Sequence, residues 1–259
     1  MKSLLKKILP AKLTSFIARH LQAERDHLTN LKFSAPLLEM NIIGVTSKDY
    51  ENYKYIREAE HQIGRFINMQ KILKEIEDTS LIGDLVEFGT WQGQGLRLFD
   101  LAITHKTNRK LVGIDSFEGL PETSTVWHKG TFSNTSKDMV AKTLDSNIKN
   151  FDSVELIQGW FDNPSVANEL YEKVKDISIV HLDADLASST TTALNILEKY
   201  MEGRTSPMFL LFDDWGCHPN EVPEAFNSWL ASVKSKYNIQ EEIVGYTNLT
   251  RYFKLNFKN

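Results

Sequence analysis

The chain has 259 residues, of which 41% are hydrophobic and 25% are charged, a composition typical of a globular protein with a substantial core. Acidic residues outnumber basic ones by 34 to 30, and the net charge of -4 speaks against general nucleic-acid binding, which needs a basic surface. A single cysteine, Cys217, excludes an intrachain disulfide and favours a reducing compartment, so we expect a cytoplasmic protein.

The first part of the chain, to about Ile82, is predicted to be helical. Between Leu4 and Leu21 apolar residues form one face beside several lysines. This pattern fits a helix on a membrane surface or an arm that packs on its own domain or on a second subunit, and we favour the arm. We therefore predict a helical arm over residues 1–57, with a role in homo-oligomer formation, and one domain over 58–259 that begins with a helix to Glu77. No apolar run is long enough for a membrane span, and no signal peptide is expected.

The segment from Asp84 to Gly95 is predicted to be a buried strand that ends in a glycine-rich turn and opens a helix. A dinucleotide-binding turn places a glycine where this chain has Trp91, whose ring would obstruct a pyrophosphate. A cofactor without phosphates meets no such obstacle, and Glu87 beside the turn suits a cationic ligand. S-adenosylmethionine fits both conditions, although an ordinary strand-to-helix turn would give the same pattern. The candidate cofactor contacts here are Glu87, Gly89, Thr90 and Gly93.

Strands and helices then alternate, which is typical of a parallel sheet covered on both faces. The predicted strands are Lys110–Ile114, Val154–Ile157, Ile177–Leu182 and Met208–Phe212, followed by a hairpin of Ile239–Val244 and Leu249–Leu255. The predicted helices are Lys137–Asn150, one from Pro164, Ser188–Tyr200 and Glu221–Lys236. Residues 122–136 carry turn formers and are predicted to be a mobile loop over the site. The pattern predicts a doubly wound α/β fold: a mostly parallel, seven-stranded, Rossmann-like methyltransferase sheet with a C-terminal antiparallel hairpin.

Ligands of such sheets bind beyond the carboxyl ends of the strands, so the residues that follow each strand are the candidates for function. Asp115 follows the second strand, 20 residues beyond Gly95, where a carboxylate can accept both hydroxyls of a ribose, and Ser116 stands next to it. A turn cap is the alternative role for Asp115. Gly159 and Trp160 follow the third strand and are candidates to flank an adenine, although Trp160 is equally suited to a core.

Four aspartates follow the next two strands. Asp183 and Asp185 end one strand, and Asp213 and Asp214 end its neighbour, so at least three carboxylates should converge. Their mutual repulsion is relieved by a hard divalent cation, and an all-oxygen site favours Mg²⁺, Ca²⁺ or Mn²⁺ over Zn²⁺. The alternative is that one or two of them cap the following helices. We expect His181 to be a core residue. His218 is a candidate to contact either a metal ligand or the substrate.

Five segments, taken in order, resemble the macrocin O-methyltransferase (TylF-like) family over roughly Ile56 to Lys254. They are Glu87-Phe-Gly-Thr-Trp-Gln-Gly93, Asp115-Ser-Phe-Glu-Gly-Leu-Pro121, Gly159-Trp-Phe161, Leu182-Asp-Ala-Asp-Leu186 and Asp213-Asp-Trp-Gly216. The resemblance implies a class I enzyme that uses S-adenosylmethionine and Mg²⁺ to methylate hydroxyls, chiefly on sugars of natural products. It also implies that Asp183, Asp213 and Asp214 are metal ligands and that Asp185 is the general base, and Asp183 is also a candidate cofactor contact. This chain has Ala187-Ser188 where the family usually has Tyr-Glu, so the family's substrate contacts there are not inherited.

The sequence thus predicts a metal-dependent O-methyltransferase that acts on a small-molecule hydroxyl, either of a sugar in a natural product or glycan precursor or of a phenol. Two rival functions stay open. A nicotinamide-dependent oxidoreductase is disfavoured by Trp91 and the four aspartates, and a non-catalytic partner subunit with the same fold is disfavoured by the intact acidic strand ends.

Overall fold

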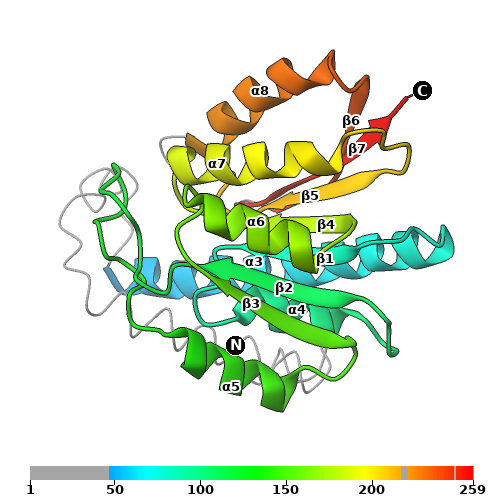
Figure 1. Cartoon of the computed structure of the whole chain (residues 1–259). Helices are drawn as coiled ribbons and strands as arrows, with labels where there is room; N and C mark the ends of the chain where they lie inside the picture. The colour runs from blue at the N-terminus through cyan, green and yellow to red at the C-terminus, as the bar shows by residue number, and fades with distance from the viewer. Residues whose placement is uncertain (1–46, 217–220, 248, 259) are drawn as a thin grey trace. The chain divides into compact units, whose positions relative to one another are not determined.

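A computed structural model of this chain describes residues 47–216, 221–247 and 249–258, with side chains described from residue 61 onward. The chain divides into two compact units, Met1–Arg65 and Phe66–Asn259, and the second contains a seven-stranded sheet. The strand order is β3-β2-β1-β4-β5-β7-β6 (Figure 1). The chain adds strands first on one side of β1 and then, from β4 onward, on the other, and doubly wound sheets bind ligands at this switch point.

The first five strands are parallel, and the last two form the expected hairpin, with β7 antiparallel to both β5 and β6. The strands are β1 Asp84–Phe88, β2 Lys110–Asp115, β3 Ser153–Gln158, β4 Ile177–Leu182, β5 Met208–Phe212, β6 Ile239–Tyr246 and β7 Arg251–Phe257. The predicted fold class is confirmed, and β4 and β5 have the predicted bounds.

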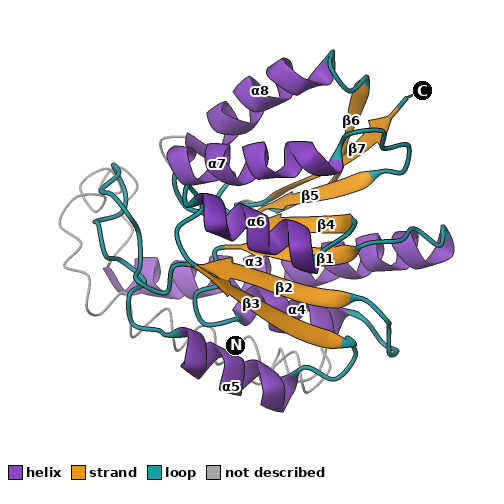
Figure 2. Ribbon diagram, in the orientation of Figure 1, coloured by secondary structure: helices purple, strands orange, loops and turns teal. Residues whose placement is uncertain are grey.

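Helices cover both faces of this sheet (Figure 2). The helices are α3 Ser47–Asp78, α4 Gln94–Ala102, α5 Lys137–Asn147, α6 Pro164–Lys173, α7 Ala187–Leu197 with the 3₁₀ turn η3 Glu198–Tyr200, and α8 Glu221–Lys234. Helices α6, α7 and α8 contribute to one hydrophobic core with β1, β2, β4 and β5. Helix α4 packs on the opposite face, where the Phe99 and His181 rings meet at 5.8 Å between centroids.

The central strand β4 shows why these residues form a sheet interior. All six of its residues are buried, and the sequence Ile-Ser-Ile-Val-His-Leu is rich in the apolar and β-branched side chains that strands covered on both faces require. Val180 and Leu182 face the α7 core together with Phe88 of β1 and Phe212 of β5, each at most 2% exposed. Complete burial of each such side chain contributes roughly 1.5–3 kcal/mol.

Several helix boundaries differ from the sequence prediction: α7 begins at Ala187 rather than Ser188, α8 ends at Lys234 rather than Lys236, and the ends of α5 and α3 differ more. Helix α5 ends at Asn147 rather than Asn150, because the Asp100 carboxylate accepts hydrogen bonds from the backbone N–H groups of Lys149 and Asn150 at 3.0 and 2.6 Å. Those two amides therefore leave the helical hydrogen-bonding pattern. The helix predicted to start near Glu58 begins at Ser47.

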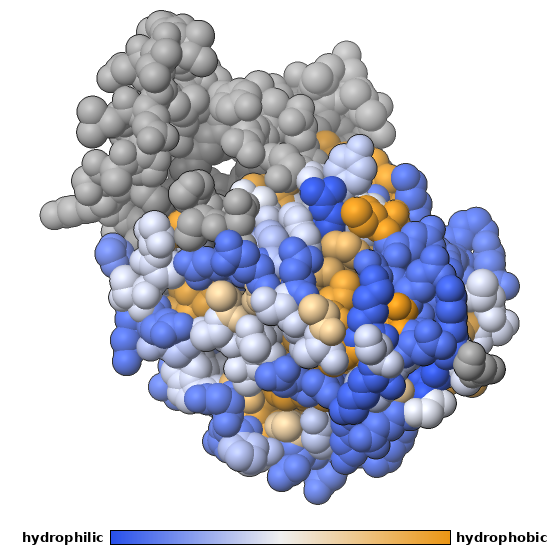
Figure 3. Space-filling model, turned by 90° about the horizontal axis from the view of Figure 1, so that it is seen from above, coloured by the Kyte–Doolittle hydropathy of each residue, from blue (hydrophilic) through white to orange (hydrophobic). Residues whose placement is uncertain are grey.

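Several predictions concern residues outside the described ranges. The arm over 1–57 lies largely there, so the arm, its role in homo-oligomer formation and the division at residue 58 stay predictions. Cys217 and His218 also lie outside the described residues. Among the described helices, none combines the length and the apolar character needed to cross a bilayer. Seen from above, the coloured surface is largely polar, with hydrophobic residues visible between the polar ones (Figure 3).

Candidate active site

The carboxyl ends of β1, β2, β4 and β5 lie next to one another, and their register brings the predicted site residues to one edge. Backbone hydrogen bonds continue the sheet one residue past three strands: Gly89 N–H donates to Ile114, Asp183 N–H to Phe88 and Asp213 N–H to Leu182, at 2.9 to 3.0 Å. Since Leu182 pairs with Phe212, Asp183 and Asp213 lie side by side on neighbouring strands.

The glycine-rich turn packs directly against the segment after β4 that contains Asp183. Gly89 has φ of +88°, and a Cβ added to it would lie 1.8 Å from the Asp183 carbonyl oxygen. No side chain fits at this position, so the turn after β1 and the segment after β4 meet backbone to backbone. Gly93, with φ of +75°, directly precedes α4, as the sequence predicts for a turn that opens a helix.

Glu87 lies beneath this turn rather than on its surface. Its side chain is 1% exposed, and Oε1 is 2.9 Å from Nδ1 of His181, whose side chain is fully buried. The pair joins β1 to β4 across the register match of Glu87 with His181. Thr90 is also buried, and its hydroxyl has no hydrogen-bond partner among the described residues. Both side chains are buried. The roles of Glu87 and Thr90 as cofactor contacts stay predictions.

Asp115 organises the backbone around the switch point. Its Oδ2 accepts the N–H of Trp91 at 2.7 Å, and its Oδ1 accepts the N–H of Phe117 at 2.6 Å. Burial raises the pKa of the Asp115 carboxyl, whereas backbone hydrogen bonds from Phe117, Trp91 and Thr90 act to lower it. Each carboxylate oxygen has a second lone pair, so these bonds leave capacity for ribose hydroxyls.

Ser116 has a local structural contact. Its hydroxyl accepts the N–H of Glu118 at 3.1 Å and lies 3.4 Å from the Gly119 carbonyl, so the side chain holds the turn that starts the loop after β2. The side chain is 6% exposed. A cofactor contact by Ser116 stays a prediction.

The structure separates the two aromatic residues that follow β3. Phe161 packs on Phe88 in an edge-to-face contact with ring centroids 5.3 Å apart, whereas Trp160 is outside the hydrophobic core cluster and only half-buried. Gly159 N–H donates to the Asp115 carbonyl at 2.9 Å. Gly159 and Trp160 therefore stand beside the Asp115 turn, and Phe161, rather than Trp160, packs against the core.

Three candidate metal ligands converge at the ends of β4 and β5. One ligand atom from each of His181, Asp183 and Asp213 lies within 4.8 Å of the other two. Two carboxylates and an imidazole are a donor set that fits a divalent cation. Asp214, a predicted ligand, is not in this group, while His181, which the sequence suggested as a core residue, is both fully buried and part of it. The predicted ligand set of Asp183, Asp213 and Asp214 stays a prediction.

Asp185 is held in an unusual backbone conformation. It has φ of +57°, the left-handed region, which aspartate adopts more readily than most residues but still at a cost. It lies between β4 and α7, where the Leu186 N–H donates to the Ala184 carbonyl at 2.5 Å. The N-cap position of α7 is Leu186, so Asp185 does not cap this helix, and its role as a base stays a prediction.

Trp215 was not singled out from the sequence, although it directly follows the Asp213-Asp214 pair. Its ring contacts those of Phe212, Phe226 and Phe253 at centroid distances of 5.3, 5.6 and 5.1 Å. The next residue, Gly216, donates its N–H to the Leu249 carbonyl at 3.0 Å. The aromatic cluster therefore anchors the segment that carries the two aspartates. In the sequence, the tryptophan directly after the paired aspartates was the feature that could have indicated this anchor.

The chain is similar in sequence and in structure to known methyltransferases. The model of the Macrocin-O-methyltransferase (TylF) family matches residues 54–254. The 8-demethyl-8-(2,3-dimethoxy-alpha-L-rhamnosyl)-tetracenomycin-C 4'-O-methyltransferase of Streptomyces olivaceus is 26% identical over 193 residues, covering 69% of this chain and 68% of that protein. Demethyldecarbamoylnovobiocin O-methyltransferase of Streptomyces niveus is 23% identical over 195 residues, covering 70% of each. In structure, the calicheamicin methyltransferase CalS11 superposes with a TM-score of 0.59 at 19% identity, covering 97% of this chain and 95% of that one, which shows the same fold.

Proposed function

This chain belongs to the macrocin O-methyltransferase (TylF) family, and is therefore an S-adenosylmethionine-using O-methyltransferase; we propose that it methylates a sugar hydroxyl with the help of a divalent cation. The family model spans 54–254 and so includes every predicted site residue. The observation that carries the metal-dependent part of the proposal is the approach of Asp183 and Asp213 on neighbouring strands beside the glycine turn. Family membership sets aside the oxidoreductase and the non-catalytic subunit.

A sugar acceptor is supported by the name of the Streptomyces olivaceus relative, which describes methylation at the 4' oxygen of a rhamnosyl group. At 26% identity the particular sugar does not carry over. This chain also differs from the family pattern at Ala187-Ser188, at the start of α7. This difference argues that its acceptor differs from those of its relatives. We therefore propose the acceptor class, a hydroxyl of a sugar on a natural product or glycan precursor. The single cysteine supports a cytoplasmic setting for this reaction.

The proposed cofactor contacts surround the switch point. Asp115 would accept the ribose hydroxyls with the lone pairs that its bonds to Trp91 and Phe117 leave available. Gly159 and Trp160, next to Asp115, would flank the adenine, because Trp160 is not committed to the core. Gly89 and Gly93 would let the methionine part approach the backbone of the turn.

The proposed chemistry assigns separate tasks to the aspartates. Asp183, Asp213 and Asp214 would hold the cation; His181 is near enough to the first two to contribute as well. When bound, a divalent cation would supply positive charge that favours the deprotonated acceptor, and S-adenosylmethionine would supply the methyl group. Asp185 would accept the acceptor's proton, and the surrounding edge would hold the acceptor oxygen in line for the displacement.

The test uses the full chain and S-adenosylmethionine labelled in its methyl group. Nucleotide-activated deoxysugars and glycosylated natural products are screened as acceptors in Mg²⁺ and in excess EDTA. We expect labelling of a sugar hydroxyl that depends on the cation. Calorimetry should show that Asp183→Asn and Asp213→Asn both lose Mg²⁺ binding and that Asp213→Asn keeps S-adenosylhomocysteine binding. Full activity in EDTA would remove the metal from the proposal, and label transferred to phenols but to no sugar would replace the acceptor class.

A further inference from the structure

Trp91 occupies a position where a bulky residue is unexpected. It lies in the turn after β1 with φ of +43°, in the left-handed region that large side chains adopt only when their surroundings hold them there. Glycine or asparagine would adopt this conformation at lower cost. The structure therefore contains contacts specific to the tryptophan that maintain it.

Three hydrogen bonds of Trp91 join two parts of the site. Its backbone N–H donates to Asp115 Oδ2 at 2.7 Å. Its carbonyl accepts the Thr135 hydroxyl, and its indole Nε1–H donates to Asn134 Oδ1, both at 3.0 Å. Asn134 and Thr135 lie at the end of the loop between β2 and α5, 43 and 44 residues along the chain from Trp91. One residue thus links the proposed ribose carboxylate to that loop.

The same loop is tied to Asp115 at its start and to aromatic rings near its end. Asp115 Oδ1 accepts the N–H of Phe117, which also has a positive φ of +59°. The Trp91 ring packs against Phe132 with centroids 5.3 Å apart, and Phe132 packs against Trp127 at 5.1 Å. Both oxygens of one carboxylate therefore hold backbone groups on which the position of the loop depends.

The middle of the loop reaches the proposed base. Glu122 Oε1 accepts the Ser188 hydroxyl at 2.5 Å, and Ser188 lies in the first turn of α7, three residues after Asp185. The loop between β2 and α5 therefore makes contacts beside the end of β1 and beside the end of β4. Figure 1 shows it leaving the sheet at the arrowhead ends of the strands.

We propose that Trp91 is a positioning residue that transmits occupancy of the Asp115 subsite to the loop of residues 116–136, so that cofactor binding orders the part of the protein beside the acceptor. The inference rests on the proposed function through the ribose contact of Asp115. Hydroxyls bound to Asp115 restrict its carboxylate, the carboxylate restricts the backbone of Trp91 and Phe117, and the indole restricts Asn134. By thermodynamic linkage the effect is reciprocal, so loosening the loop weakens cofactor binding by the same factor.

The test measures hydrogen exchange of peptides covering 116–136 in the full chain, with and without S-adenosylhomocysteine. Wild type should show slower exchange when the ligand is present. Asn134→Ala removes the oxygen that accepts the indole N–H, and Trp91→Phe removes the N–H but keeps a ring. Both should lose most of the ligand-dependent protection and bind S-adenosylhomocysteine about 5-fold more weakly or worse. Asn134→Asp keeps an acceptor oxygen and should restore both readouts. The ligand dependence of the protection is the readout that a merely structural role of this hydrogen bond would leave unchanged.

The matched control is Ser133→Ala, an exposed neighbour in the same loop, which should behave as wild type. Asn134 is itself exposed, so its alanine variant tests the idea even if Trp91→Phe folds poorly. Wild-type protection and affinity in Asn134→Ala would overturn the role of Trp91 while leaving the proposed function intact. Failure of the wild-type chain to bind S-adenosylhomocysteine would overturn both.

Discussion

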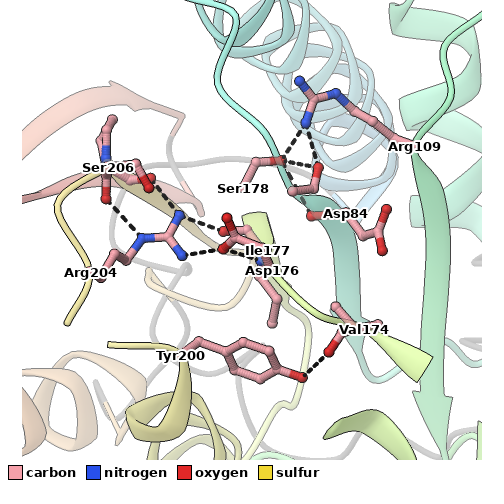
Figure 4. Close-up of polar contacts among 11 residues, drawn as sticks. Asp84, Arg109, Val174, Asp176, Ile177, Ser178, Tyr200, Arg204 and Ser206 are labelled. Carbon is pink, nitrogen blue, oxygen red and sulfur yellow. Dashed lines mark hydrogen bonds and ion pairs between the residues drawn. The ribbon is translucent and has the colours of Figure 1, made fainter. Parts of the chain in front are cut away.

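The two edges of the sheet use charge in opposite ways. At the amino edge, Arg204 has a side chain only 4% exposed and donates to the carbonyls of Ser206, Ile177 and Pro207 at 2.8 Å and to Asp176 at 2.6 Å (Figure 4). Arg109 donates to the carbonyls of Gly83 and Leu81. Burial lowers the pKa of the Arg204 guanidinium, and the charge of Asp176 opposes that shift. Each arginine satisfies backbone groups that burial would otherwise leave without partners.

At the carboxyl edge, charges of one sign gather instead. Asp183 and Asp213 approach each other, and Asp185 follows with a positive φ. The residues with a positive φ, which costs backbone strain, also differ between the two edges. The positive-φ residues Ser80 and Asn238, before β1 and β6, are small and polar, whereas the carboxyl edge adds the bulky Trp91 and Phe117, after β1 and β2, to Asp185. The difference indicates that the amino edge is arranged for stability and the carboxyl edge for binding, at some cost in stability.

The strongest test of that contrast is removal of the proposed base. Asp185→Asn should lose roughly 10²- to 10⁴-fold in turnover, the scale of general acid–base catalysis, without loss of folding stability. Affinity for S-adenosylhomocysteine and Mg²⁺ should persist, and raising the pH should restore part of the rate, because more of the acceptor hydroxyl is then deprotonated without help. Asp145→Asn, at an exposed site on α5, is the control. Loss of Mg²⁺ binding in Asp185→Asn would make it a ligand instead.

Removal of a charge at the amino edge should have the reverse effect. Arg204→Ala should lower the free energy of unfolding by about 3 kcal/mol, because three backbone carbonyls and Asp176 lose a charged donor. Urea denaturation measures this loss, and turnover per folded molecule should equal that of wild type. Arg204→Lys keeps the positive charge but lacks the planar guanidinium group, so its free energy of unfolding should lie between those of Arg204→Ala and wild type. A large fall in turnover with unchanged stability would erase the distinction between the edges.

Asp115 tests whether an aspartate beyond a strand end serves the cofactor. Asp115→Ala should weaken S-adenosylmethionine and S-adenosylhomocysteine together by about 1.5–3 kcal/mol, since both carry the same ribose and the lost bonds involve a charged group. Isothermal calorimetry provides both affinities. Asp152→Ala, an exposed aspartate just before β3 at the amino edge, should leave them unchanged. Equal affinities in Asp115→Ala and wild type would remove Asp115 from the ribose subsite.

The smallest effect is expected for an ion pair that is only partly buried. Lys173 Nζ, at the end of α6, lies 2.7 Å from Glu155 Oε2 on β3, and both side chains are about a third exposed, at 32% and 30%. Lys173→Met should therefore change the free energy of unfolding by only about 0.2–1 kcal/mol, and less at high salt. The comparison with Arg204→Ala isolates the contribution of burial. A loss as large as that of Arg204→Ala would mean that charge alone, and not burial, stabilises the amino edge.

Much of the fold follows from local patterns. The buried runs of β4 and β5 and the turn formers between them fix where strands start and stop, and an acidic residue directly after a parallel strand must lie at the binding edge. For that reason the positions of Asp115, Asp183 and Asp213 at this edge could be predicted from the order of residues alone. The end of α5 could not, because it depends on Asp100, 49 and 50 residues away from the amides that it accepts.

The sequence by itself determined the order of elements, the fold class and which residues stand at the carboxyl edge, because these depend on side-chain periodicity and chain direction. Only the tertiary structure decided which of those residues meet. Glu87 and His181 are 94 positions apart, and Trp91 and Asn134 are 43 apart. Such pairs form when separate strands and loops pack, and no local pattern encodes their partners. The same packing brought His181 to the carboxylates and directed the charge of Arg204 to backbone carbonyls.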